Sequence, residues 1–123
     1  MDILDLIQFE DPNKSGGVVK ATIHKTGKLG FSAAAQDYLS LGDDSYFKIG
    51  FNNQDNADES IYMVPSIDAD GAFKVAKAGG YYYLNLKYIF DKKEIDYQNQ
   101  TYIYDIKKQS SNNVEYFILK KRK

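Results

Sequence analysis

The most restrictive feature of this chain is a series of short segments in which apolar and polar side chains alternate. Residues 19–24 read Val-Lys-Ala-Thr-Ile-His, which indicates a strand with one buried face. Similar segments follow at 29–31, 46–51, 61–64, 73–75, 81–84, 101–106 and 114–119. Polar or glycine-containing connections separate them, and Pro65 is expected to end the segment at 61–64. The chain is therefore expected to fold mainly as sheet.

Two segments have helical signals instead. Ser32 precedes an alanine-rich run, so we expect a short helix over 33–41 with Ser32 as its N-cap. Gly42 follows that run and is suited to the left-handed position after a helix. Asn85 is expected to cap a second short helix over 86–93.

The two halves of the chain carry these signals in the same order. Residues 23–31 align with 75–83 at a constant offset of 52, with lysine and glycine coinciding and an apolar or aromatic residue at each inward position. In each half a helix follows, and then two strands separated by a polar loop, at 52–60 and 107–113. We therefore expect a strand-rich α+β fold made of a duplicated β-β-α-β-β unit with internal pseudo-twofold symmetry. The alternative is a small hairpin-rich protein in which such an alignment arises without duplication.

Length and composition set the outer limits of these expectations. A chain of 123 residues fits one domain, with pseudo-repeats at about 18–67 and 71–119 and an N-terminal segment at 1–17. Residues 2–9 are either a strand or a single helical turn, and 11–17 form a loop. Cysteine is absent, and neither a secretory signal nor an apolar stretch of membrane-spanning length is visible. We expect a cytoplasmic protein without a membrane partner.

Charge is distributed unevenly, and this suggests a binding face. Residues 1–66 contain 5 lysines and 10 acidic residues, whereas 67–123 contain 11 basic and 7 acidic residues. Seven residues on or beside the two hairpins are candidates for binding nucleic acid: Lys20, Lys25, Lys28, Lys74, Lys77, Tyr81 and Tyr83. Lysines would neutralise phosphates, and tyrosines would stack on unpaired bases. Pseudo-symmetry would bring both hairpins onto one basic face. The alternative is a solvated strand face whose lysines deter edge-to-edge aggregation and whose tyrosines border the core.

Part of the first half resembles a known family. Gly27-Lys28 with Leu29 and Phe31, a short helix, Gly42-Asp43 and the strands at 46–51 and 61–64 resemble the swapped-hairpin domain of AbrB-like regulators and antitoxins. The likeness covers about residues 18–66, and it implies DNA contacts through Lys25 and Lys28. Ser32 and Gln36 stand where that family usually has proline and arginine. The arrangement of four strands between two helices also resembles Whirly and Pur-type single-strand binders.

Catalytic and metal-binding patterns are not found. His24 is the only histidine, and no phosphate-binding glycine loop or metalloprotease motif is present. The Asp68-Ala69-Asp70-Gly71 segment resembles part of a calcium loop but would place Lys77 at the bidentate position, so calcium is not expected. We expect a non-catalytic nucleic-acid-binding domain without a cofactor, with DNA or RNA as the partner. The alternative is a protein-interaction or assembly module that self-associates.

Overall fold

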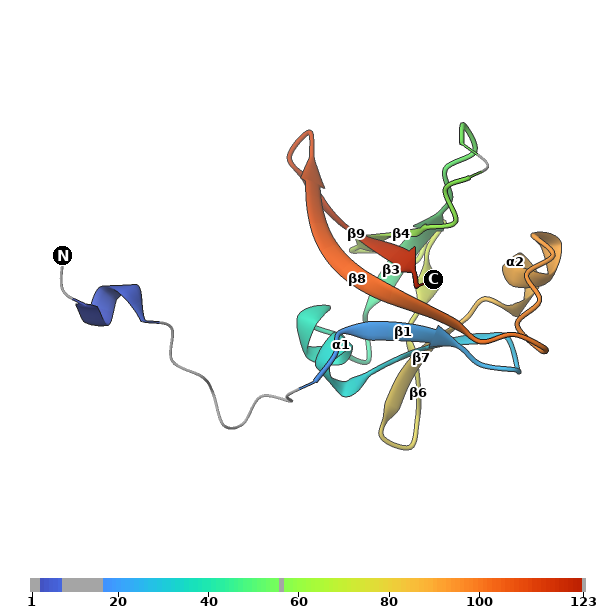
Figure 1. Cartoon of the computed structure of the whole chain (residues 1–123), viewed down its shortest axis with the longest axis horizontal. Coiled ribbons are helices and arrows are strands. Elements are labelled where there is room, and N and C mark those ends of the chain that lie inside the picture. Colours follow the sequence, from blue (N-terminus) through green and yellow to red (C-terminus); the bar gives the residue numbers. More distant parts are fainter. Residues whose placement is uncertain (1–2, 8–16, 56, 123) are drawn as a thin grey trace.

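The computed structural model describes residues 3–7, 17–55 and 57–122. Within these residues nine strands form one sheet, flanked by two short α-helices (Figure 1). The expectation of a strand-rich α+β chain is confirmed. The elements are η1 (Ile3–Leu6), β1 (Lys20–Ile23), β2 (Lys28–Phe31), α1 (Ala33–Tyr38), β3 (Tyr46–Gly50), β4 (Ile61–Ser66), β5 (Phe73–Lys74), β6 (Ala76–Ala78), β7 (Tyr81–Asn85), α2 (Lys87–Lys92), β8 (Tyr102–Ser111) and β9 (Val114–Lys121).

The sheet curls back on itself. Its strands follow the order β5-β3-β4-β9-β8-β1-β2-β7-β6, and every neighbouring pair is antiparallel. The two edge strands, β5 and β6, are consecutive in the chain and are separated by Val75 alone. The Val75 amide donates to the Ser45 carbonyl at 2.9 Å, on the β3 side. One bent segment thus joins both edges of the sheet, as in a closed barrel, and few strand edges remain unpaired.

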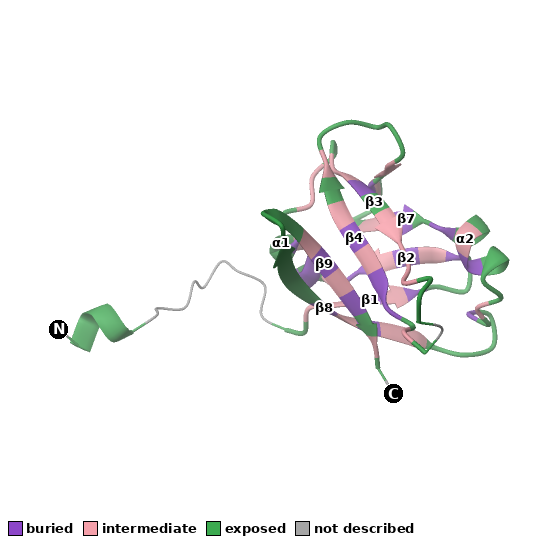
Figure 2. Cartoon of the chain, turned by 90° about the horizontal axis from the view of Figure 1, so that it is seen from above, coloured by how far each residue is buried: buried purple, intermediate pink, exposed green. Residues whose placement is uncertain are grey.

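One hydrophobic core lies inside this curled sheet. Buried residues alternate with more exposed ones along the central parts of several strands, which Figure 2 shows as alternating colours on β4 and β9. Residues from β1, β2 and β7 meet residues from β3, β4, β8 and β9 in a single buried cluster. Helices α1 and α2 lie at opposite ends of the sheet (Figures 1 and 2). Both contribute buried residues to the core, including Ala35 and Phe90.

Two strand boundaries differ from expectation. Strand β4 continues through Pro65 to Ser66, because β9 pairs only with Ile61–Met63 and leaves one side of β4 free of ladder bonds beyond that point. A proline lacking an N–H is tolerated there. Residues 107–111 were expected to form a loop, but they extend β8, and only Asn112 and Asn113 turn the chain, both with positive φ. The extension is exposed on both faces, so no apolar alternation marks it in the sequence.

The burial of side chains in the β6–β7 hairpin also differs from expectation. Residues 23–31 and 75–83 each contain a hairpin, but Tyr81 and Tyr83 are not inward equivalents of Leu29 and Phe31. Leu84 is the buried residue of β7, because it pairs with Leu29 across the β2–β7 ladder. Period-two geometry then turns Tyr81 and Tyr83 to the outer face.

Both helices are shorter than expected. Ser32 is the N-cap of α1 as expected, and its hydroxyl oxygen accepts from the Ala35 amide at 3.2 Å. The helix ends before Leu39, and Ser40, not Gly42, adopts positive φ. The N-cap of α2 falls on Leu86, one residue after Asn85, which accepts only a long bond from the Lys87 amide at 3.4 Å.

The N-terminal segment is described only at residues 3–7. Ile3–Leu6 forms a 3₁₀ turn, which agrees with the helical alternative. The loop expected at 11–17 lies outside the described residues except for Gly17. Among the helices that the structure describes, none combines the length and apolar character needed to cross a membrane.

Candidate nucleic-acid interface

A shallow groove lies on the outer face of β1, β2 and β7. It has a volume of about 350 Å³ and is lined by Lys20, Thr22, His24, Thr26, Lys28, Gly30, Phe31, Ser32, Ala78, Tyr81, Tyr82 and Tyr83. Lys20 and Thr22 of β1 and Lys28 and Gly30 of β2 alternate with the buried residues Ala21, Ile23 and Leu29, so the pleat presents these four lining residues on one face. Among the residues that the structure describes, no carboxylate lines this groove. Its cationic side chains are Lys20 and Lys28.

The floor of the groove depends on Gly30. A Cβ atom built on Gly30 would lie 2.3 Å from Nε2 of His24, so the imidazole occupies the space that a side chain at position 30 would need. Gly30 pairs with Thr22 on β1 and with Tyr83 on β7. Gly30 therefore leaves room for the His24 imidazole at the point where three strands meet.

Aromatic and cationic groups are already in contact along the β2–β7 pair. The ammonium of Lys28 lies 4.6 Å from the ring centroid of Tyr83, within the range of a cation–π interaction. Tyr81 lies two residues before Tyr83 on the same face, and 71% of its surface is exposed. One wall of the groove therefore offers a ring held by a lysine and a second ring open to solvent.

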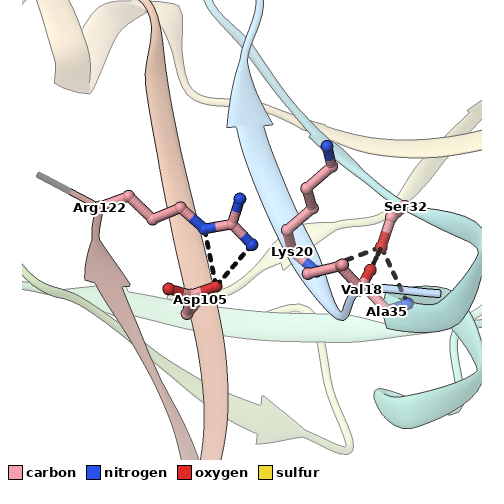
Figure 3. Close-up of polar contacts among 6 residues, drawn as sticks. All are labelled: Val18, Lys20, Ser32, Ala35, Asp105 and Arg122. Carbon is pink, nitrogen blue, oxygen red and sulfur yellow. Dashed lines mark hydrogen bonds and ion pairs between the residues drawn. The ribbon is translucent and has the colours of Figure 1, made fainter.

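Lys20 is held by its backbone while its side chain remains available (Figure 3). The Ser32 hydroxyl donates to the Val18 carbonyl at 2.7 Å and accepts from the Lys20 amide at 3.2 Å. Asp105 lies opposite Lys20 on β8, but its carboxylate binds Arg122 at 2.8 Å. The Lys20 ammonium points away from this pair in Figure 3, and it forms no ion pair with any described residue.

The seven candidate residues do not form one face. Lys20, Lys28, Tyr81 and Tyr83 line the groove, whereas Lys25, Lys74 and Lys77 are not among its lining residues. Lys77 pairs with Tyr82, and its ammonium lies 5.5 Å from that ring, on the other side of the hairpin from Tyr81 and Tyr83. Lys74 pairs with Tyr46 of β3. Four of the seven candidates thus share the groove, whereas Lys77 faces the other side of its hairpin because alternate residues of a strand face opposite ways.

A second groove, at the α2 end of the sheet, was not anticipated from the sequence. Its volume is about 830 Å³, and it lies between α2 and the connection from β3 to β4. Ile49, Phe51, Ile89 and Ile95 are among its apolar lining residues, Tyr88, Lys92 and Lys93 lie on or beside α2, and Asp55, Asp58 and Glu59 line the connection. The ammonium of Lys93 lies 4.2 Å from the Phe51 ring centroid. Its residues come from segments about 40 positions apart, so no local pattern marked it.

The acidic connection of this second groove is internally bonded. The Tyr62 hydroxyl donates to Asp58 at 2.6 Å, and the Ser60 amide donates to the same carboxylate at 2.9 Å. These bonds, that of Tyr62 first, hold the pKa of Asp58 well below its usual range. The same bond raises the pKa of Tyr62 to about 12. Within the described residues no cluster of three or more histidine, aspartate or glutamate side chains could hold a metal ion.

Comparisons with known proteins do not identify a family for this chain. No protein-family model, no curated protein and no solved structure matches the chain. The candidate interface therefore depends on its own geometry.

Proposed function

We propose that this protein is a non-catalytic domain that binds single-stranded nucleic acid in the groove on β1, β2 and β7. The observation that supports this most is the composition of the groove, in which the described residues include Lys20, Lys28, Tyr81 and Tyr83 but no carboxylate. Proteins that bind unpaired strands combine cations that follow the backbone with aromatic rings on which bases stack.

The roles of the residues follow from their positions. The Lys20 ammonium, which has no carboxylate partner among the described residues, would contact phosphate. Tyr81, which is 71% exposed, would stack on a base. Lys28 already lies over Tyr83, so a base on that ring would meet a preformed cationic edge. The net charge of the chain is −1, so attraction would come from the local face and not from the whole molecule.

Charge reversal tests the phosphate contacts. Lys20→Glu with Lys28→Glu should weaken the binding of a labelled oligonucleotide by at least about tenfold in 50 mM salt and flatten its salt dependence. Lys48→Glu with Lys74→Glu makes the same change in net charge on exposed residues of β3 and β5 that do not line the groove, and it serves as the matched control. Fluorescence anisotropy at two salt concentrations measures both. Equal losses in the two variants, or no binding by the native chain at low salt, would refute the proposal.

Aromatic substitution tests the stacking contacts. Tyr81→Ala should cost about 1–3 kcal/mol of binding to a single strand, since one stacked base would be lost. Tyr88→Ala removes a tyrosine that is 78% exposed in the other groove, and it should leave the affinity unchanged. A duplex should bind more weakly than a single strand because its bases are already stacked.

We also propose that the fold arose by duplication of a β-β-α-β-β unit, with a pseudo-twofold axis between β2 and β7 and between β4 and β9. The set of strand pairs is unchanged when β1, β2, β3 and β4 are exchanged with the β5–β6 segment, β7, β8 and β9. Core positions correspond under this exchange, with offsets of 52 to 57 that differ from strand to strand. The equivalent pairs are Ala21/Phe73, Ile23/Val75, Leu29/Leu84, Phe31/Leu86, Phe47/Tyr104, Ile49/Ile106, Ile61/Phe117 and Met63/Leu119.

The ends of the helices support the same proposal. After α1, Ser40 has positive φ, and the Leu41 amide donates to the Gln36 carbonyl at 3.0 Å. After α2, Glu94 has positive φ, and the Ile95 amide donates to the Phe90 carbonyl at 3.0 Å. Both are Schellman motifs with an apolar residue at the second position past the cap. The resemblance of residues 18–66 to the AbrB-like domain is compatible with such a unit. Superposing the two halves of an experimental structure tests the duplication, and a best fit in another register would contradict it.

A further inference from the structure

The N-terminal turn presents apolar side chains to solvent. In η1 and the residue after it, Ile3 is 68%, Leu6 70% and Ile7 45% exposed. Figures 1 and 2 show this turn apart from the sheet, with none of its residues buried. Clusters of exposed large apolar residues are unusual on a monomeric protein and mark surfaces that become covered.

The same segment is strongly acidic. Residues 1–11 read Met-Asp-Ile-Leu-Asp-Leu-Ile-Gln-Phe-Glu-Asp, with four carboxylates and no basic side chain. Its preferred surface should therefore combine apolar contacts with positive charge.

The two grooves of the molecule differ in this respect. The described residues that line the groove on β1, β2 and β7 include Lys20, Lys28 and three tyrosines but no carboxylate. The groove beside α2 includes Asp55, Asp58 and Glu59 along one wall. Lys92 and Lys93 also line the α2 groove, so its cations and carboxylates largely offset one another. The β1–β2–β7 groove is lined by lysines without such an offset and would attract the acidic segment more strongly.

The attachment point favours the same groove. Val18 is bonded to Ser32 at its margin, and Lys20 is part of its wall. Twelve residues separate Ile7 from Lys20, which corresponds to a reach of about 40 Å when extended. A segment tethered this closely has an effective concentration in the millimolar range, so even weak docking within one chain is favoured over docking between chains.

We propose that the segment Ile3–Ile7 docks in the β1–β2–β7 groove of its own chain and there competes with nucleic acid. Its apolar side chains would cover the exposed ring of Tyr81, and the Asp5 carboxylate would face Lys20 or Lys28. The proposed docking depends only on the properties of the Ile3–Ile7 segment and of the groove, whereas the proposed competition rests on the proposed function.

Disulfide trapping tests the docking directly, since the native chain contains no cysteine. Leu6→Cys with Tyr81→Cys should form an intramolecular bond under mild oxidation at low protein concentration. Leu6→Cys with Tyr88→Cys is the matched control, because Tyr88 is a similarly exposed tyrosine in the other groove. We expect the first bond to form at least about fivefold faster, measured by mass spectrometry. Equal rates, or a product that is a disulfide-linked dimer, would overturn the proposal.

Competition is tested by a change that leaves net charge constant. Ile3→Ser with Leu6→Ser and Ile7→Ser alters exposed residues only, so the fold should persist. If the docked form makes up about 70–90% of molecules, this variant should bind an oligonucleotide about three- to tenfold more tightly than the native chain. Unchanged affinity would refute competition. Trapping without any oligonucleotide binding would leave docking intact and refute the proposed function, whereas binding without trapping would do the reverse.

Discussion

The starts of the two helices show how the same element order can be stabilised in different ways. At α1, the Ser32 side chain makes three hydrogen bonds, to Val18, Lys20 and Ala35, and so joins the helix to β1. At α2, the N-cap residue is Leu86, which makes no side-chain cap bond and is 1% exposed. One helix is anchored by polar contacts at its cap and the other by burial of the cap residue itself.

The hairpins before the helices differ in a parallel way. The first turn contains Gly27, which has φ of +86° and is packed so closely that an added Cβ would lie 2.6 Å from Cβ of Lys87. The second turn contains Gly79, also with positive φ but with nothing within 4 Å of an added Cβ. The first turn is therefore part of the contact with α2, whereas the second projects into solvent. Residues at equivalent places in the chain order therefore need not contribute equally to stability.

The largest effect should come from the buried cap. Leu86→Ala removes a fully buried side chain next to Phe90, and it should lower the free energy of unfolding by about 4 kcal/mol. Urea denaturation followed by circular dichroism measures this. A loss below about 1 kcal/mol would mean that Leu86 does not anchor α2.

The next largest effects are expected at Gly27 and Gly79, whose substitutions should lower the free energy of unfolding by different amounts. Gly27→Ala combines a left-handed backbone with a steric clash and should cost about 2–3 kcal/mol. Gly79→Ala carries the backbone penalty alone and should cost about 1 kcal/mol. Thermal unfolding of the two variants side by side tests the difference, which should vanish if the first turn does not contact α2.

The third largest effect is expected at Ser32, the polar N-cap of α1. Ser32→Ala should cost about 1–2 kcal/mol, because it removes an N-cap and the bond to Val18 together. Asn85→Ala loses only a long bond to the Lys87 amide and should cost less than about 0.5 kcal/mol. Native-state hydrogen exchange at the Ala35 and Lys87 amides would locate each loss. Similar costs for both would contradict the contrast between the two caps.

The helix ends, where the halves agree, should respond alike. Ser40→Gly and Glu94→Gly should each raise the melting temperature, with a gain of about 0.5–1 kcal/mol, since each side chain now occupies a left-handed position. A gain at one end and a loss at the other would show that these ends are not equivalent.

The β3–β4 connection also differs from the β8–β9 connection. It contains the hydrogen bond between Tyr62 and Asp58, whose contribution to stability depends on pH. The pKa of Tyr62 is raised to about 12 by Asp58, so this bond stabilises the fold below about pH 10 and is lost as pH rises toward 12. The pKa of Asp58 is lowered, so its contribution is present above its ordinary value of 3.8 and is lost as pH falls below that. In Asp58→Asn, NMR of the Tyr62 ring should show a pKa close to 10. A pKa still near 12 would exclude Asp58 as the cause.

Local signals identified most elements and part of the candidate site. Alternation located the strands, and Ser32 was identified as an N-cap because capping depends on neighbours within one turn. Local reasoning failed at Ser40, which takes the left-handed position expected at Gly42, while Leu39 before it is buried in the core. It also failed at Pro65, which lies two residues beyond Met63, the last β4 residue that pairs with β9. It placed Lys77 with Lys28, because sequence alone does not show which face of an exposed ribbon meets which strand.

What the sequence determined by itself is the set of short strands and helices, and which side of most strands is apolar, because period and capping are properties of adjacent residues. The tertiary structure alone decided the pairing of β2 with β7, the closure of the sheet at Val75 and the grouping of Lys20, Lys28, Tyr81 and Tyr83 in one groove. These depend on register between segments about 55 residues apart, and a shift of one residue would exchange the buried and exposed faces.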